Sequence, residues 1–106
     1  MIEVIVNRPS FEYDIHSLVK AFFPREDVQV RVQDTFSDET PVRMTVHFTD
    51  EQVSFSVTED GCPKENGEQT IDYSDRKGTK THLKRLIYRK LSNYTGQELP
   101  WGTLTG

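Results

Sequence analysis

Seven basic side chains lie between Arg76 and Lys90, with no acidic residue among them. They are Arg76, Lys77, Lys80, Lys84, Arg85, Arg89 and Lys90, out of thirteen lysines and arginines in the chain. Guanidinium groups bind carboxylates and phosphates in a bidentate manner, and ammonium groups add positive charge. The cluster predicts an anion-binding surface whose contacts are Lys80, Lys84, Arg85 and Arg89. The alternative is the solvated outer face of a packed helix, which serves only solubility.

Charge is divided very unevenly along the chain. Residues 1–75 carry six basic and sixteen acidic side chains, a formal charge of -10, whereas residues 76–106 carry seven basic side chains and Glu98, a charge of +6. The total of -4 therefore hides a strongly polarised molecule. An acidic first part disfavours binding of a phosphate backbone anywhere except on the basic segment.

Other kinds of chemistry find little support in the spacing of reactive residues. The histidines are too far apart in sequence to form a metal-binding motif: His16, His47 and His82. The single cysteine, Cys62, has no histidine or clustered base beside it that would activate a thiolate. The acidic pairs fall where turns require polar residues: Asp50-Glu51 and Glu59-Asp60. We therefore expect neither a metal site nor a catalytic residue in this chain.

The basic residues belong to an expected helix over residues 79–95. Apolar side chains recur there at three- and four-residue steps and form one stripe: Leu83, Leu86, Ile87, Leu91 and Tyr94. Thr79 or Thr81 is expected to cap the start, and Asn93 or Gly96 to end the helix. Four side chains are expected to point away from the stripe: Lys84, Arg85, Tyr88 and Arg89.

The segment after this helix carries Leu99, Trp101 and Leu104 among glycines and polar residues. Exposed Trp and Leu side chains gain nothing until another surface covers them. We expect these three residues to dock on another domain, so that the polypeptide is part of a longer one.

The run KTHLKRLIYRKLSNYTGQELPWGTLTG resembles the linker region of the HemZ branch of oxygen-independent coproporphyrinogen III oxidase-like proteins. Residues 77–106 carry the resemblance, and Leu99–Gly106 is its most specific part. These proteins are radical SAM enzymes, oxidoreductases of porphyrin and haem biosynthesis. The resemblance implies that residues 1–96 are an N-terminal accessory domain and that residues 97–106 begin the linker to a downstream catalytic domain.

The implied catalytic domain would use a [4Fe-4S] cluster and S-adenosylmethionine. Such a cluster takes three cysteines spaced Cys-x3-Cys-x2-Cys, and this chain has only Cys62. We therefore expect no cofactor and no catalytic residue in this chain itself. The implied substrate, coproporphyrinogen, carries four propionate groups that the basic helix could help to hold.

The rest of the chain predicts a single α+β domain with the order β-α-β-β-β-α. Alternating apolar residues indicate strands over residues 2–6, 28–33, 42–48 and 53–58, and an apolar stripe over residues 11–22 indicates a helix that ends before Pro24. We expect a two-layer sandwich in which a four-stranded, mostly antiparallel sheet carries both helices on one face. The first two strands, joined through a helix, should be parallel. Residues 59–78 read as a long loop, disordered or functional, with a short strand around residues 70–73.

Three hypotheses for the basic helix remain open. In the first, it docks on the downstream domain and helps to hold the substrate. In the second, it binds nucleic acid and Tyr88 stacks on a base, and in the third it only keeps the domain in solution. No stretch approaches the roughly 20 apolar residues of a membrane span. A lone cysteine and the absence of a signal-peptide pattern favour a cytoplasmic location.

Overall fold

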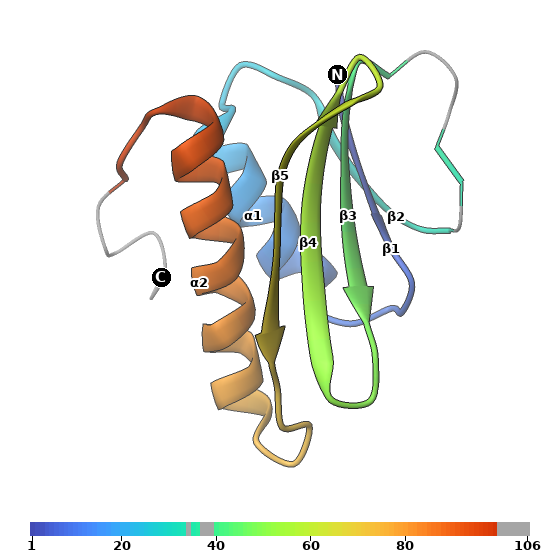
Figure 1. The fold of residues 1–106 in the computed structure, drawn as a ribbon, viewed down its shortest axis with the longest axis vertical. Coiled ribbons are helices and arrows are strands. Elements are labelled where there is room, and N and C mark those ends of the chain that lie inside the picture. The colour runs from blue at the N-terminus through green and yellow to red at the C-terminus, as the bar shows by residue number, and fades with distance from the viewer. Residues whose placement is uncertain (34, 37–39, 100–106) are drawn as a thin grey trace.

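A computed structural model describes residues 1–33, 35–36 and 40–99 of the chain (Figure 1). The elements follow one another as β1 (Ile2–Val6), α1 (Glu12–Phe22), β2 (Val28–Val32), β3 (Val42–Phe48), β4 (Gln52–Glu59), β5 (Cys62–Thr70) and α2 (Arg76–Thr95). The strands form one sheet, and both helices lie on the same side of it (Figure 1). The protein therefore has the expected two-layer α+β architecture.

The sheet is mixed and has five strands in the order β2-β1-β3-β4-β5. Strand β1 pairs in parallel with β2 on one side and with β3 on the other. Strands β3, β4 and β5 continue as an antiparallel meander. The expected parallel pairing of the first two strands is confirmed, but the expectation of four mostly antiparallel strands is wrong.

The missing strand is β5, which occupies part of the segment expected to be a loop. A two-residue turn joins it to β4, and both turn residues have positive φ angles, 51° at Asp60 and 81° at Gly61. This backbone suits the twist of a hairpin, and Asp-Gly is a favoured pair for it. The side chains of β5 that face the helices are Glu65, Gly67 and Gln69, opposite Val57, Phe55 and Val53. Because none of the three is apolar, the strand shows no alternating pattern in the sequence.

The core lies between the sheet and the two helices. Strand β1 contributes Ile2, Val4 and Val6, and the other strands add a matching set of buried residues: Val28, Met44, Val46, Phe48, Val53, Phe55 and Val57. The expected stripes of both helices cover them, with Ile15, Leu18, Val19 and Phe22 from α1 and Leu83, Leu86, Ile87 and Leu91 from α2. The two amphipathic helices are therefore held in place by apolar burial on one face.

Helix α2 begins earlier than the threonines indicated. Asp75 caps it, because its carboxylate accepts a hydrogen bond from the backbone N–H of Gly78. Thr79 is buried instead, and its hydroxyl donates to the backbone carbonyl of Asp72. Gly96 ends the helix in the left-handed conformation, as expected.

The opposite face of β1 is buried too. Glu3 and Ile5 point away from the helices, yet they are 0% and 7% exposed. Strand β1 lies between β2 and β3 in the sheet. On this face Gln33 donates to the carboxylate of Glu3, and Phe36 packs against the guanidinium of Arg43. Strand β1 is therefore buried on both faces.

Candidate functional site

The basic side chains of α2 divide into two groups with different surroundings. Lys80 and Lys84 face α1, where their ammonium nitrogens lie 3.3 Å and 4.0 Å from the carboxylate of Asp14. Lys84 is only 6% exposed, although the sequence indicated that it points outward. The structure thus brings an acidic partner from residues 1–75 to the basic helix. Sequence spacing along α2 alone could not reveal this pair.

Arg85 and Arg89 lie one helical turn apart on the exposed side of α2. Among the described residues, neither guanidinium group takes part in a hydrogen bond, an ion pair or a cation–π contact. Residues at this spacing are neighbours on a helix surface, about 6 Å apart along the axis. Two free guanidinium groups at this distance can bind two carboxylates or phosphates of one ligand.

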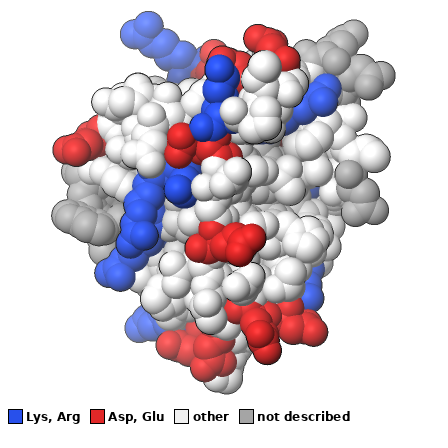
Figure 2. Space-filling model, viewed as in Figure 1, with Lys and Arg blue, Asp and Glu red and all other residues white. Residues whose placement is uncertain are grey.

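Two other cations of α2, Arg76 and Lys90, contact neighbouring elements. Arg76 covers the ring of Phe11, with its guanidinium carbon 4.7 Å from the ring centre. The side chain of Lys90 lies across Gly67 of the neighbouring strand β5. Figure 2 shows basic side chains in a band over α2, with acidic side chains over β5 and around the lower end of the molecule. The positive surface is therefore narrow.

Tyr88 turns inward, in contrast to the expected outward orientation. Its ring packs edge-on against Phe22, with ring centres 5.5 Å apart. Its hydroxyl accepts a hydrogen bond of 2.8 Å from the backbone N–H of Leu99 and donates one of 2.5 Å to the carbonyl of the same residue. Leu99 packs against the core. Of the expected docking residues, Trp101 and Leu104 lie outside the described residues.

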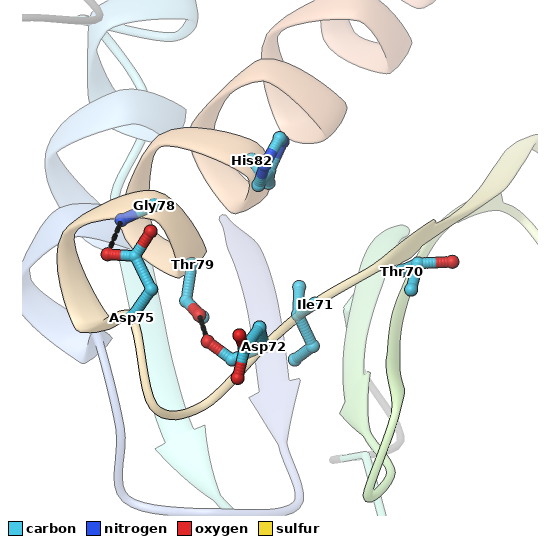
Figure 3. Close-up of a pocket in the computed structure, with 7 residues that line it drawn as sticks. All are labelled: Thr70, Ile71, Asp72, Asp75, Gly78, Thr79 and His82. Carbon is cyan, nitrogen blue, oxygen red and sulfur yellow. Dashed lines mark hydrogen bonds between the residues drawn. The ribbon is translucent and has the colours of Figure 1, made fainter.

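A small pocket of about 170 Å³ lies at the start of α2 (Figure 3). Its lining consists of Thr70, Ile71, Asp72, Asp75, Gly78, Thr79 and His82. Asp75 is occupied as the helix cap, and hydrogen bonds from the side chain and backbone of Ser74 hold the pKa of Asp72 below its usual value. The acidic lining argues against anion binding here, and the polar groups already serve the turn between β5 and α2.

A second pocket, of about 110 Å³, lies on the sheet face opposite the helices. Its lining consists of Ile5, Val6, Asn7, Gln33, Thr45, Val46 and His47. The amide of Asn7 bonds both to the N–H and to the carbonyl of Phe48, and the amide of Gln33 bonds to Thr35 and Glu3. These amides hold strand ends together.

Among the described residues, no three His, Cys, Asp or Glu side chains come together in a way that could hold a metal ion. None of the described helices has the length and the apolar character to cross a membrane.

No protein-family model, no curated protein and no solved structure matches this chain.

Proposed function

We propose that residues 1–96 form the non-catalytic N-terminal domain of a HemZ-like radical SAM protein, related to oxygen-independent coproporphyrinogen III oxidases of porphyrin and haem biosynthesis. The domain docks on a downstream catalytic domain of the same chain and helps to hold the propionate-bearing substrate. It works in the cytoplasm. The resemblance of residues 77–106 leads to this proposal, and the two hydrogen bonds between Tyr88 and Leu99 are the structural observation that supports it most.

These hydrogen bonds join the start of the proposed linker to the domain. Leu99 comes three residues after Gly96, where α2 ends. Because Tyr88 holds both backbone groups of Leu99, the direction in which the chain leaves the domain depends on α2. A linker held in this way positions one domain against the next better than a free one does. Leu99, Trp101 and Leu104 are then the proposed docking residues.

The proposed substrate contacts are unequal. The guanidinium groups of Arg85 and Arg89 have no partner among residues 1–33, 35–36 and 40–99, and each can bind a propionate in bidentate fashion. Lys80 and Lys84 share Asp14 as an ion-pair partner. In this proposal they add positive charge beside the arginines and do not contact the propionates directly. Within the proposal, Arg85 and Arg89 are therefore the residues to test.

The proposal places the iron–sulfur cluster and S-adenosylmethionine outside this domain. Three thiolates are needed for such a cluster, whereas the chain has Cys62 alone, exposed at the start of β5. The residues present therefore do not fit the cofactor, and no chemical step is assigned to them. The direct test of the assignment is the gene sequence past the codon for Gly106. A Cys-x3-Cys-x2-Cys run there would support it, and a stop codon directly after Gly106 would refute it.

Substrate binding can be tested with coproporphyrin III, the stable oxidised form of the proposed substrate. Calorimetric titration should show binding that weakens at least tenfold in the Arg85→Ala/Arg89→Ala double variant. Lys77→Ala, which removes another exposed cation of α2, is the matched control and should bind as the wild type does. Equal affinity of the double variant and the wild type would remove both arginines from the site.

The same titration distinguishes nucleic-acid binding, the alternative function. Affinity for a single-stranded RNA should fall steeply with salt, with a log–log slope of about -0.7 per phosphate contact. Porphyrin binding should keep much of its affinity because a large part of it is apolar. Steep salt dependence with RNA, together with no response to coproporphyrin III, would favour the nucleic-acid alternative.

A further inference from the structure

Strand β5 has an open outer edge. Strand β5 stands last in the sheet, and among the described residues no strand pairs with its outer edge. Its side chains are exposed or half-buried along its whole length. An open edge of this kind presents unpaired backbone N–H and C=O groups that another strand can bind.

The charges of β5 are arranged about its centre, Asn66. Strand alternation places Lys64, Asn66 and Glu68 on the sheet face opposite the helices, whereas Glu65 and Gly67 face the helices. Among the described residues, the side chains of Lys64 and Glu68 take part in no ion pair or hydrogen bond. The two opposite charges therefore lie two residues to either side of the centre, on one face, without partners.

We propose that this edge binds a second copy of the chain, with the two β5 strands antiparallel and a twofold axis through Asn66. In this register Lys64 lies opposite Glu68 of the second copy, and Glu68 opposite its Lys64. Opposite charges directly across an antiparallel pair stabilise it, and like charges destabilise it. The result is a continuous sheet of two copies, closed by symmetry.

Neighbouring registers lack this complementarity. Directly opposite residues of an antiparallel pair lie on the same face of the sheet. The twofold axis can therefore pass through a residue but not between two residues. An axis at Lys64, Glu65 or Glu68 puts a like-charged pair directly on the axis. An axis at Gly67 places Lys64 opposite Thr70, so no ion pair forms. Charge alone therefore selects the register about Asn66.

The helix face supports the same register. Glu65 there lies opposite Gly67 of the second copy, and the side chain of Lys90 covers Gly67. A Cβ atom at Gly67 would lie 2.5 Å from Cε and 3.3 Å from Nζ of Lys90. Because Gly67 has no side chain, the Lys90 ammonium can lie over it. There it would meet the carboxylate of Glu65 from the second copy. The dimer would therefore have two symmetry-related ion pairs on each face of the joined sheet. They are Lys64 with Glu68 on one face and Lys90 with Glu65 on the other.

The bound segment is short. The register with β4 shifts between Val57 and Thr58, which leaves Lys64 without a partner on β4, and the adjacent Pro63 cannot donate to a ladder. The paired region is therefore centred on residues 64–68. An interface of this size belongs to the weak class that buries less than about 1,200 Å². We expect a dimer that forms as the concentration rises into the millimolar range.

Sedimentation velocity over a concentration series tests the proposal. The wild type should shift from monomer to dimer, and Lys64→Glu or Glu68→Lys alone should weaken the dimer at least tenfold, because each places like charges opposite each other. The double variant Lys64→Glu/Glu68→Lys restores opposite charges and should dimerise as the wild type does. Glu51→Lys, at the exposed β3–β4 turn, is the control that leaves the dimer intact.

Cross-linking tests the register directly. With Cys62→Ser as background, Asn66→Cys places two thiols on the axis, where strand pairs bring Cα atoms to about 4.5–5.5 Å, within reach of a disulfide. Glu68→Cys in the same background is the matched control, because its two copies would lie about 13 Å apart. A rapid disulfide at Asn66 and none at Glu68 is expected. A monomer at every concentration, a dimer indifferent to charge reversal, or equal cross-linking at both positions would each overturn the proposal.

Discussion

The hydroxyl of Tyr88 bridges the backbone N–H and the backbone C=O of Leu99. One side chain of α2 thus satisfies both polar groups of a residue eleven positions further on. The ring beneath it packs on Phe22 of α1. The segment after α2 is therefore tied to the interior of the two-layer sandwich and not only to its surface.

Removal of this hydroxyl should loosen the segment without damaging the core. Tyr88→Phe keeps the ring but leaves both backbone groups of Leu99 without their partner, so we expect a loss of about 1–2 kcal/mol in the free energy of unfolding. Hydrogen exchange at the Leu99 amide should become much faster. Tyr13→Phe is the control, since Tyr13 is 82% exposed and should change neither quantity. Unchanged exchange at Leu99 in Tyr88→Phe would contradict the role of the bridge.

Asp14 should stabilise the contact between the helices. The side chain of Lys84 is 7% exposed and that of Asp14 is 20% exposed, so Asp14→Asn leaves a largely buried ammonium with less compensation. We expect the free energy of unfolding to fall by about 1–3 kcal/mol in urea titrations. Glu51→Gln removes an exposed acid and should have almost no effect. Equal stability of Asp14→Asn and the control would show that the contact contributes nothing.

Tyr94 should show an unusual titration. Burial, the hydrogen bond from its hydroxyl to Glu59 and the negative charges of Glu59 and Asp60 raise the pKa of Tyr94 to about 12, from 10.0 for a free tyrosine. The pKa is higher in the folded state, so this stabilisation is complete below pH 10.0 and is lost as the pH rises from there to about 12.

Absorbance at the tyrosinate band checks this behaviour. The ionisation with a midpoint at about pH 12 should be missing in Tyr94→Phe, and Glu59→Gln should lower the pKa of Tyr94 because the negative charge is removed. The stability difference between the wild type and Tyr94→Phe should shrink above pH 10.0. An unchanged midpoint in Glu59→Gln would rule out Glu59 as a cause.

The β4–β5 turn should depend on its glycine for conformational reasons. No atom lies within 4 Å of a Cβ built on Gly61, so Gly61→Ala meets no clash and tests only the positive φ angle. The cost should be about 1–2 kcal/mol. Asp60→Gly relaxes the neighbouring positive φ and serves as the comparison, with little change expected. Urea unfolding of both variants gives the two values, and a neutral Gly61→Ala would contradict the described turn.

The spacing of apolar residues was sufficient to predict four strands, both helices and the face that the helices cover. Val4, Met44 and Phe55 all lie where this pattern placed them. The same pattern failed for β5, because the residues of this edge strand that face the helices include Glu65 and Gly67, which are not apolar. Backbone pairing with β4 holds the strand in the sheet. Only the Asp60-Gly61 pair signalled the hairpin in the sequence.

The candidate site was predicted less completely than the fold. Exposure of Arg85 and Arg89 followed from the helix period, but the burial of Lys84 did not. Its partner Asp14 lies on the other helix, and no spacing within one helix can reveal a contact between two. The same holds for Tyr88, whose hydrogen bonds reach beyond the end of α2.

The buried strand β1 also has a consequence for how the protein forms during synthesis. Ile2 pairs with Val28 on one side and with Val42 on the other, so both neighbours of β1 are made well after it. By contrast, β3, β4 and β5 follow one another directly as hairpins. Strand β1 is thus made before the other four strands and has to wait for β3 before its second edge is paired, so that the two halves of the sheet close around it.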